Sequence, residues 1–135
     1  MQAIQLSLQN YNSVCLKLIG LISDTHGHLD PKVYKYFDKV DEIWHAGDVG
    51  NFEVIEKLKE FKPLKGVYGN IDGQRVRAEF PENLRFICEG LDVWITHIGG
   101  YPNRYDNRVR AQIFENPPQL FITGHSHILK VMWDK

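Results

Sequence analysis

The sequence has little of what marks a secreted or membrane-spanning chain. Its 135 residues include only two cysteines, Cys15 and Cys88, far apart and in apolar surroundings. We expect them to be small buried residues in a reducing compartment, and neither a disulfide nor part of a zinc site. Residues 1–12 lack the basic start and apolar core of a secretion signal, and no apolar run is long enough to cross a bilayer. These absences favour a cytoplasmic protein with no membrane partner.

An excess of charge of either sign is also absent. The chain carries 16 Lys and Arg against 17 Asp and Glu, for a formal net charge of −1. Without a basic surface, nucleic acid is not an expected partner. Arg104, Arg108 and Arg110 are confined to one stretch. They form either a solvated helix face or a contact for a substrate phosphate, and a nuclease is the weaker hypothesis.

The composition that is present is ordinary for a globular domain. Hydrophobic residues make up 43% and charged residues 24% of the chain. We predict one domain over residues 1–135, with residues 1–13 as a possible extension. Weak alternation of apolar residues over 1–11 makes this stretch either a frayed end or an extra edge strand.

Apolar runs alternate with stretches of helical periodicity, which predicts an α/β fold. Asp30 and Asn51 are candidate N-caps, and Glu89-Gly90 marks a hairpin. Residues 74–83 are interpreted as a charged connection, and residues 128–133 as a further strand. Strands are predicted over residues 14–23, 42–46, 64–68, 84–88, 91–96 and 119–123. Helices are predicted over residues 30–41, 52–62 and 105–115.

Five of these predicted strands end in residue types that bind metals. The first of them leads into Asp24-Thr25-His26, and its apolar run over residues 18–22 has no polar alternation, which is typical of a strand buried on both faces. Ligands of open α/β sheets bind at the carboxyl ends of strands. Each motif alone is compatible with an ordinary turn, but five independent turns would rarely all select Asp, Asn or His. The residues concerned are Asp24, His26, Asp48, Asn70, His97, His125 and His127.

This set contains two carboxylates, one amide oxygen and four imidazoles. It suits Mn, Fe, Ni, Zn or Co better than Ca or Mg, which prefer oxygen ligands alone. Seven ligands are too many for one ion that must keep an open position. The sequence therefore predicts two ions that share a carboxylate.

The ordered motifs together resemble the calcineurin-like metallophosphoesterase superfamily, and within it the small bacterial and archaeal phosphodiesterase branch. The resemblance extends from about residue 16 to residue 127. It implies a four-layer α/β/β/α sandwich of mixed sheets. The motifs are Asp24-x-His26, Gly47-Asp48, Gly69-Asn70-x-Asp72, Thr96-His97-x-Gly99 and Gly124-His125-x-His127.

The resemblance also implies roles for the seven residues. Asp24, His26 and His127 would hold one metal, and Asn70, His97 and His125 the other. Asp48 would bridge the two ions, with a hydroxide between them that attacks phosphorus in line. The implied activity is hydrolysis of a small phosphate ester, most simply a phosphodiester. Asp48, Asn70 and His97 would be its catalytic residues, and Mn is the favoured metal.

The sequence departs from the family pattern at two places. Many larger relatives have a proton-donating His after the Asn, whereas this chain has Ile71. We therefore expect slow turnover and a preference for good leaving groups, with a catalytically weak protein-binding scaffold of the same fold as the alternative. His28 would substitute as donor, support the ligands or lie on the surface, and Asp72 would orient ligands. His45 would either support the ligands or pack within its strand, and packing is favoured.

The second departure is at the C-terminus. The family's further strand pair with an Asn-Pro-Gly-Ser stretch does not follow residues 124–127, so the domain looks short there. An incompletely paired strand over residues 128–133 would favour a homodimer.

Overall fold

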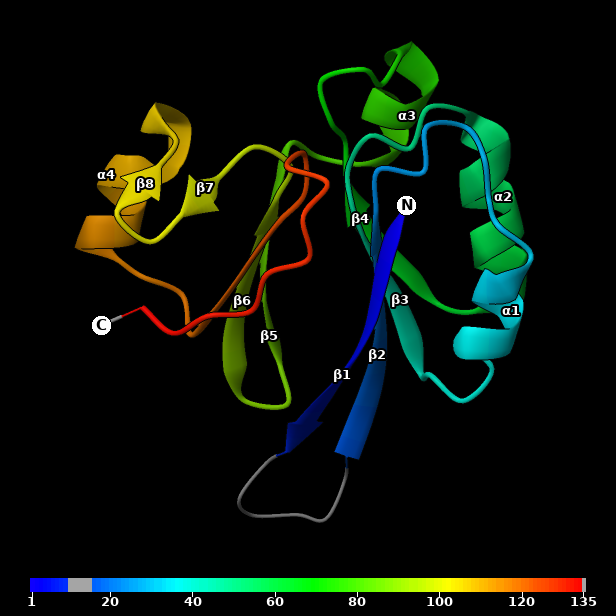
Figure 1. The fold of residues 1–135 in the computed structure, drawn as a ribbon, viewed down its shortest axis with the longest axis horizontal. Coiled ribbons are helices and arrows are strands. Elements are labelled where there is room, and N and C mark those ends of the chain that lie inside the picture. The colour runs from blue at the N-terminus through cyan, green and yellow to red at the C-terminus, as the bar shows by residue number, and fades with distance from the viewer. Residues whose placement is uncertain (10–15, 135) are drawn as a thin grey trace.

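The computed structural model describes residues 1–9 and 16–134, and it contains two sheets that face each other (Figure 1). The first sheet has the strand order β1-β2-β3-β4. Its strands β2, β3 and β4 are parallel, and β1 pairs antiparallel with β2. Their bounds are β1 Gln2–Gln9, β2 Leu16–Ser23, β3 Glu42–Ala46 and β4 Leu64–Val67.

The second sheet has the order β5-β6-β9. Strands β5 and β6 form the predicted antiparallel hairpin, and β9 is parallel to β6. Strands β7 and β8 pair as a short separate ribbon. The bounds are β5 Asn83–Cys88, β6 Leu91–Thr96, β7 Gly100–Tyr101, β8 Arg104–Tyr105 and β9 Leu120–Thr123.

Helices cover the outer side of each sheet (Figure 1). Helices α1 and α2 lie beside the first sheet, and α4 lies beyond the second. The bounds are α1 Lys32–Tyr36, α2 Phe52–Phe61, α3 Gln74–Glu79 and α4 Asn107–Glu115. None of the helices in the described part of the chain is long and apolar enough to cross a lipid bilayer.

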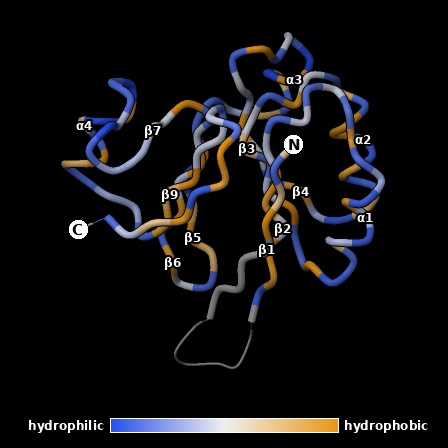
Figure 2. Tube along the Cα trace, viewed as in Figure 1, coloured by the Kyte–Doolittle hydropathy of each residue, from blue (hydrophilic) through white to orange (hydrophobic). Residues whose placement is uncertain are grey.

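The buried residues among those described form three clusters, one between each pair of neighbouring layers. Because successive side chains of a strand point to opposite faces, Ile43 packs on the helical side of the first sheet while Trp44 packs against the second sheet. Likewise Ile95 faces the first sheet and Trp94 packs with Val109 of α4. Figure 2 shows the hydrophobic residues concentrated along the strands of both sheets. The layer order is therefore α/β/β/α, as the resemblance implied.

The N-terminal segment is the extra edge strand of the two alternatives, because β1 pairs with β2 along its whole length. Asn51 caps α2 as predicted, since its side chain accepts a hydrogen bond from the backbone N–H of Glu53. Cys88 is buried and free, and burial raises the pKa of its thiol. Cys15 lies outside the described residues.

Three local predictions are wrong. The helix predicted over residues 30–41 is shorter, with Pro31 at its N-cap position and its end at Tyr36, because the backbone of Asp41 donates to Leu18 O and draws the chain into the sheet. The charged connection over residues 74–83 contains α3, which buries Val76 on one side.

The third error is the strand predicted over residues 128–133. This segment has no regular structure, and its side chains are exposed, with Trp133 at 97%. A strand needs a neighbouring strand to satisfy its backbone groups, and none of the described strands pairs with these residues. The homodimer inferred from this strand stays a prediction.

Candidate metal centre

The parallel strands bring the predicted ligands together in two groups at their carboxyl ends. In the first cluster, Asp24, His26 and His127 offer ligand atoms that lie within 4.8 Å of one another. His127 Nε2 is 3.1 Å and His26 Nε2 is 3.8 Å from Asp24 Oδ1. Asp24 and His26 follow β2, and His127 follows β9. Residues about one hundred positions apart in sequence thus share one small volume.

The second cluster consists of Asp48, His97 and His125, whose ligand atoms also lie within 4.8 Å of one another. His97 Nε2 is 3.2 Å from Asp48 Oδ1 and 3.1 Å from Asn70 Oδ1. Asn70 therefore belongs with this cluster, as the sequence motif suggests. These residues follow β3, β4, β6 and β9.

Asp48 lies between the two clusters. Its Oδ1 faces His97 of the second cluster at 3.2 Å, whereas its Oδ2 is 3.8 Å from His26 Nε2 of the first. The side chain is almost completely buried. The two oxygens of one fixed carboxylate are thus turned toward different groups of imidazoles, which is the geometry that a shared ligand requires.

The carboxylate of Asp24 shows that the first cluster fits a cation. Its Oδ2 accepts hydrogen bonds from the hydroxyl of Ser23 at 2.5 Å and from the backbone N–H of His125 at 3.1 Å. Its Oδ1 is buried and accepts no hydrogen bond from any residue in the described ranges. Leaving a buried carboxylate oxygen without a hydrogen bond is costly. A metal ion bound to Oδ1 would compensate this cost.

The second cluster fits a cation for a related reason. His97 Nδ1 lies 2.8 Å from the carbonyl oxygen of Ala46, an atom that can only accept, so Nδ1 carries the proton in the neutral ring. Nε2 then presents a lone pair toward Asp48 Oδ1 and Asn70 Oδ1. Three acceptors converge without a proton between them. A backbone carbonyl that fixes the ring in this way is the usual support of a metal-binding histidine.

Most of the candidate ligands have a left-handed backbone. Non-glycine residues rarely adopt positive φ, and strain of this kind concentrates at functional sites. Five of the seven candidates have φ between 49° and 69°. They are Asp24, His26, Asp48, His125 and His127.

The carboxylate of Asp72 connects two of the ligand-bearing loops through hydrogen bonds to their backbones. It is buried, and its carboxylate accepts hydrogen bonds from the backbone N–H groups of Val49 at 3.1 Å, Gly50 at 2.7 Å and Gly69 at 2.8 Å. Val49 and Gly50 follow Asp48 on one loop, and Gly69 precedes Asn70 on the other. The orienting role predicted for Asp72 is compatible with these contacts.

His45 and Thr25 join the loops that follow β2 and β3. The backbone N–H of Gly47 donates to His45 Nδ1 at 3.2 Å, so Nε2 carries the proton and donates to Thr25 Oγ1 at 3.0 Å. Thr25 in turn donates to the carbonyl oxygen of Val49 at 3.0 Å. Burial lowers the pKa of His45 to about 4, which keeps the ring neutral at pH 7.

Sequence reasoning missed this connection. It favoured packing over a supporting role for His45, and the fully buried ring does pack, but it also makes two hydrogen bonds. Sequence reasoning also assigned no role to Ser23 or Thr25, although these residues directly precede and follow Asp24 in the chain. His28 is exposed, and within residues 1–9 and 16–134 its side chain makes no hydrogen bond or ion pair. The structure therefore does not bring His28 into the network around the ligands.

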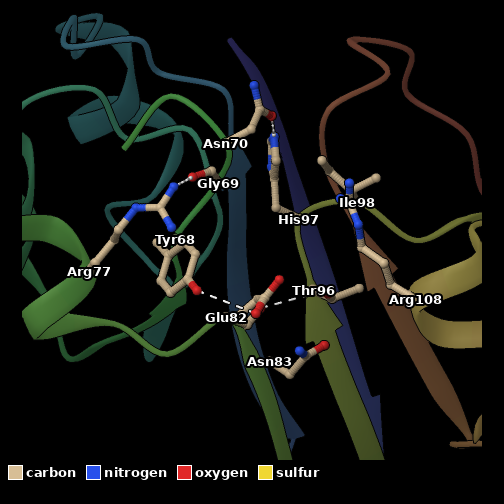
Figure 3. Close-up of a pocket in the computed structure, with 10 residues that line it drawn as sticks. All are labelled: Tyr68, Gly69, Asn70, Arg77, Glu82, Asn83, Thr96, His97, Ile98 and Arg108. Atoms are coloured by element: carbon tan, nitrogen blue, oxygen red, sulfur yellow. Dashed lines mark hydrogen bonds between the residues drawn. The ribbon is translucent and has the colours of Figure 1, made fainter. Parts of the chain in front are cut away.

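A cavity of about 350 Å³ adjoins the second cluster, and Asn70 and His97 form part of its wall (Figure 3). Arg77 and Tyr68 line one side, and Ile98 and Arg108 line the other. A ligand atom at the second cluster therefore has space beside it.

The family model for the calcineurin-like phosphoesterase superfamily domain matches residues 18–135. The chain belongs to this superfamily. A probable metallophosphoesterase of Methanothermobacter thermautotrophicus is 31% identical over 115 residues, which is 82% of this chain and 66% of that protein. Against a probable metallophosphoesterase of Methanocaldococcus jannaschii, this phosphoesterase domain spans 58% of the relative's length.

Solved structures agree with this assignment. An archaeal phosphodiesterase superposes with a TM-score of 0.66 at 25% identity, covering 82% of this chain and 73% of that one. Vacuolar protein sorting 29 from Cryptosporidium parvum superposes with a TM-score of 0.69 at 22% identity, covering 87% and 69%. The calcineurin-like phosphoesterase domain thus has the metallophosphatase fold, and the second likeness shows the fold alone.

Proposed function

We propose that this protein is a metal-dependent phosphodiesterase that hydrolyses a small phosphorylated substrate. Asp24, His26 and His127 would hold one divalent ion. Asn70, His97 and His125 would hold the second, and Asp48 would contact both. The observation that carries the proposal is the placement of Asp48, whose two carboxylate oxygens face the two clusters. The phosphodiesterase among the structural neighbours supports the same reaction class.

The bound ions would supply Lewis acidity toward a phosphate ester and an activated water as nucleophile. The chain's own part is to hold that centre rigidly. Asp48 and Asn70 are anchored through the three backbone hydrogen bonds to Asp72, and His97 is oriented by the carbonyl oxygen of Ala46. Imidazole with carboxylate is compatible with Mn, which we favour, and with Ni, Zn, Fe or Co.

The residue after Asn70 limits the range of substrates. Ile71 is 46% exposed at the site, and its side chain has no proton to give to a departing alkoxide. Its backbone N–H instead donates to Asp48 Oδ1 at 3.1 Å. We therefore expect efficient hydrolysis only of esters with good leaving groups, such as nitrophenolate.

The test is hydrolysis of bis-p-nitrophenyl phosphate by the purified chain with and without added Mn²⁺. Asp48→Asn should abolish metal-stimulated activity, because a neutral amide cannot serve two cations through two anionic oxygens. Asp38→Asn is the matched control, since Asp38 is an exposed acid outside both clusters. Equal activity of wild type and Asp48→Asn would refute the proposal.

A catalytically weak scaffold is the second candidate, and Ile71 is the observation that favours it. The fold is shared with vacuolar protein sorting 29. A folded chain that binds two ions per molecule by calorimetry, yet hydrolyses no nitrophenyl ester with any first-row metal, would favour the scaffold over the enzyme.

A further inference from the structure

The cavity beside the second cluster has two arginines on opposite walls, and they differ in how many contacts their guanidinium groups make (Figure 3). The guanidinium group of Arg77 is already bound by neighbouring residues of the chain. Its Nε donates to Asp72 O at 2.6 Å, its Nη2 to Gly69 O at 3.3 Å, and its guanidinium stacks over the Tyr68 ring at 4.3 Å. These contacts make Arg77 a part of the wall.

Arg108 is held much less. It extends from the first turn of α4 toward Ile98, and 60% of its side chain is exposed (Figure 3). Its ion pair with Asp106 is long, with 3.7 Å between Nε and Oδ1, and Asp106 also caps the helix by accepting from the backbone N–H of Arg108. Within the part of the chain that the structure describes, most of the guanidinium N–H groups of Arg108 therefore remain free for a ligand in the cavity.

The end of the cavity away from Asn70 and His97 carries a carboxylate and an amide, in contrast to the positive charge of Arg108. Glu82 lies there and accepts a hydrogen bond from the Tyr68 hydroxyl at 3.3 Å (Figure 3). Asn83 beside it uses its carbonyl oxygen to accept from Trp94 Nε1 at 3.2 Å, which leaves its NH2 group to donate. This end suits hydroxyl or carbonyl groups, and the carboxylate repels an anion. An anion in the cavity would therefore bind at the Arg108 wall.

We propose that this cavity binds one organic substituent of the phosphate ester, and that Arg108 binds a second anionic group carried by that substituent. The inference rests on the proposed function, because the first phosphate is taken to lie at the metal clusters. It narrows the substrate class to phosphate esters with a second negative charge and hydrogen-bonding groups, such as nucleoside or sugar bisphosphates. Arg108 would then determine specificity.

The experiment compares thymidine 5′-(p-nitrophenyl phosphate) with the same ester carrying a 3′-phosphate. In both, water cleaves the bond between phosphorus and the nitrophenyl oxygen, releasing nitrophenolate and a thymidine 5′-phosphate. A hydrogen-bonded ion pair with a guanidinium should give about a tenfold higher kcat/KM for the 3′-phosphorylated ester in the wild type. Arg108→Gln should lower this ratio toward one, and Arg108→Lys should keep part of it, because the charge remains but the bidentate geometry is lost.

Arg110→Gln is the matched control. Arg110 is an exposed arginine on the same helix and does not line the cavity. Its replacement removes the same charge from α4, so it should leave the ratio near its wild-type value. A ratio near one in the wild type would overturn the inference, and so would an equal fall of the ratio in Arg108→Gln and Arg110→Gln.

A binding measurement separates this inference from the proposed activity. Thymidine 3′,5′-bisphosphate and thymidine 5′-monophosphate are titrated by calorimetry into the Mn²⁺-loaded chain. If neither ester is hydrolysed, a tenfold preference for the bisphosphate that Arg108→Gln removes would still support the cavity assignment, while the phosphodiesterase fails. If both esters are hydrolysed equally well, the phosphodiesterase stands and the assignment of Arg108 fails.

Discussion

Both clusters combine an aspartate with two histidines, and the second adds Asn70, but the protein holds their histidines differently. In the second cluster one histidine, His97, has a side chain that is 3% exposed and a ring fixed by Ala46, while His125 is exposed. In the first cluster both histidines are exposed, with 43% for the side chain of His26 and 55% for that of His127. A ligand that is already immobile loses less conformational entropy when it binds a metal. We therefore expect the second cluster to bind its ion more tightly and the first to exchange its ion more readily.

The largest expected effect comes from removing one histidine from each cluster. His97→Ala should weaken binding of the tighter ion by more than about 100-fold, beyond the usual effect of losing a supporting hydrogen bond. His127→Ala should weaken binding of the other ion by a smaller factor, because this exposed side chain loses more conformational entropy when it binds the metal. Calorimetric titration of Mn²⁺ into each variant measures both sites. Equal losses in the two variants, or loss of the tighter ion in His127→Ala, would contradict the comparison.

Asp72→Asn should have the next largest effect, concentrated on the second cluster. An amide offers one acceptor oxygen where the carboxylate serves three backbone N–H groups, so at least one buried donor loses its partner. We expect a loss of about 2 kcal/mol in the free energy of unfolding and about tenfold weaker metal binding. Urea denaturation and calorimetry measure the two effects.

Asp38→Asn serves again as the control, since Asp38 is exposed and lies outside the ligand loops. Wild-type metal affinity in Asp72→Asn would show that the loops hold their ligands without this carboxylate.

Much of the fold could be predicted because single strands and turns carry local signals. The run of β2 over residues 18–22, which has no polar residue, is explained by its burial between helices and the second sheet, with Ile22 packed on one side and Ile19 on the other. Glu89-Gly90 turns the hairpin with both residues at positive φ. The strand predicted over residues 128–133 failed because alternation alone does not provide a partner strand.

The candidate ligands could be predicted from the sequence, but the hydrogen bonds and backbone conformations that hold them in place could not. The hydrogen bonds from His45 to Thr25 and from Thr25 to Val49 depend on the pairing of β2 with β3, which places residues about twenty positions apart in contact. The positive φ of Asp24 and Asp48 is likewise imposed by loops that interlock, as in the hydrogen bond from the Asp24 backbone to Gly47 O at 3.0 Å. No local signal marks either feature.

His45 should make the free energy of unfolding depend on pH. Its pKa is about 4 in the folded chain, where burial disfavours the charged ring, against 6.5 for the unfolded chain. Between these values the unfolded state binds the extra proton. The free energy of unfolding should therefore fall by up to about 3 kcal/mol as the pH drops from 6.5 to 4.

Thermal unfolding at several pH values, in the presence of a chelator, measures this dependence. His45→Gln keeps an acceptor and a donor but cannot titrate, so the fall between pH 6.5 and 4 should become smaller. His28→Gln is the control, because it removes an exposed histidine from the neighbouring loop. A pH dependence that is the same in wild type and His45→Gln would show that other groups are responsible.

The smallest expected effect tests whether His28 belongs to the first cluster. His26 and His28 lie two residues apart on one loop, and both are exposed, yet only His26 has its ring nitrogen near the carboxylates of Asp24 and Asp48. His28→Gln should change Mn²⁺ affinity by less than about twofold, since its side chain lies outside the hydrogen-bond network, whereas His26→Gln should release the more weakly held ion. A large loss of affinity in His28→Gln would mean that the loop rearranges when an ion binds. The exposure of the first cluster would then reflect an open conformation, and the two clusters would not differ in rigidity once loaded.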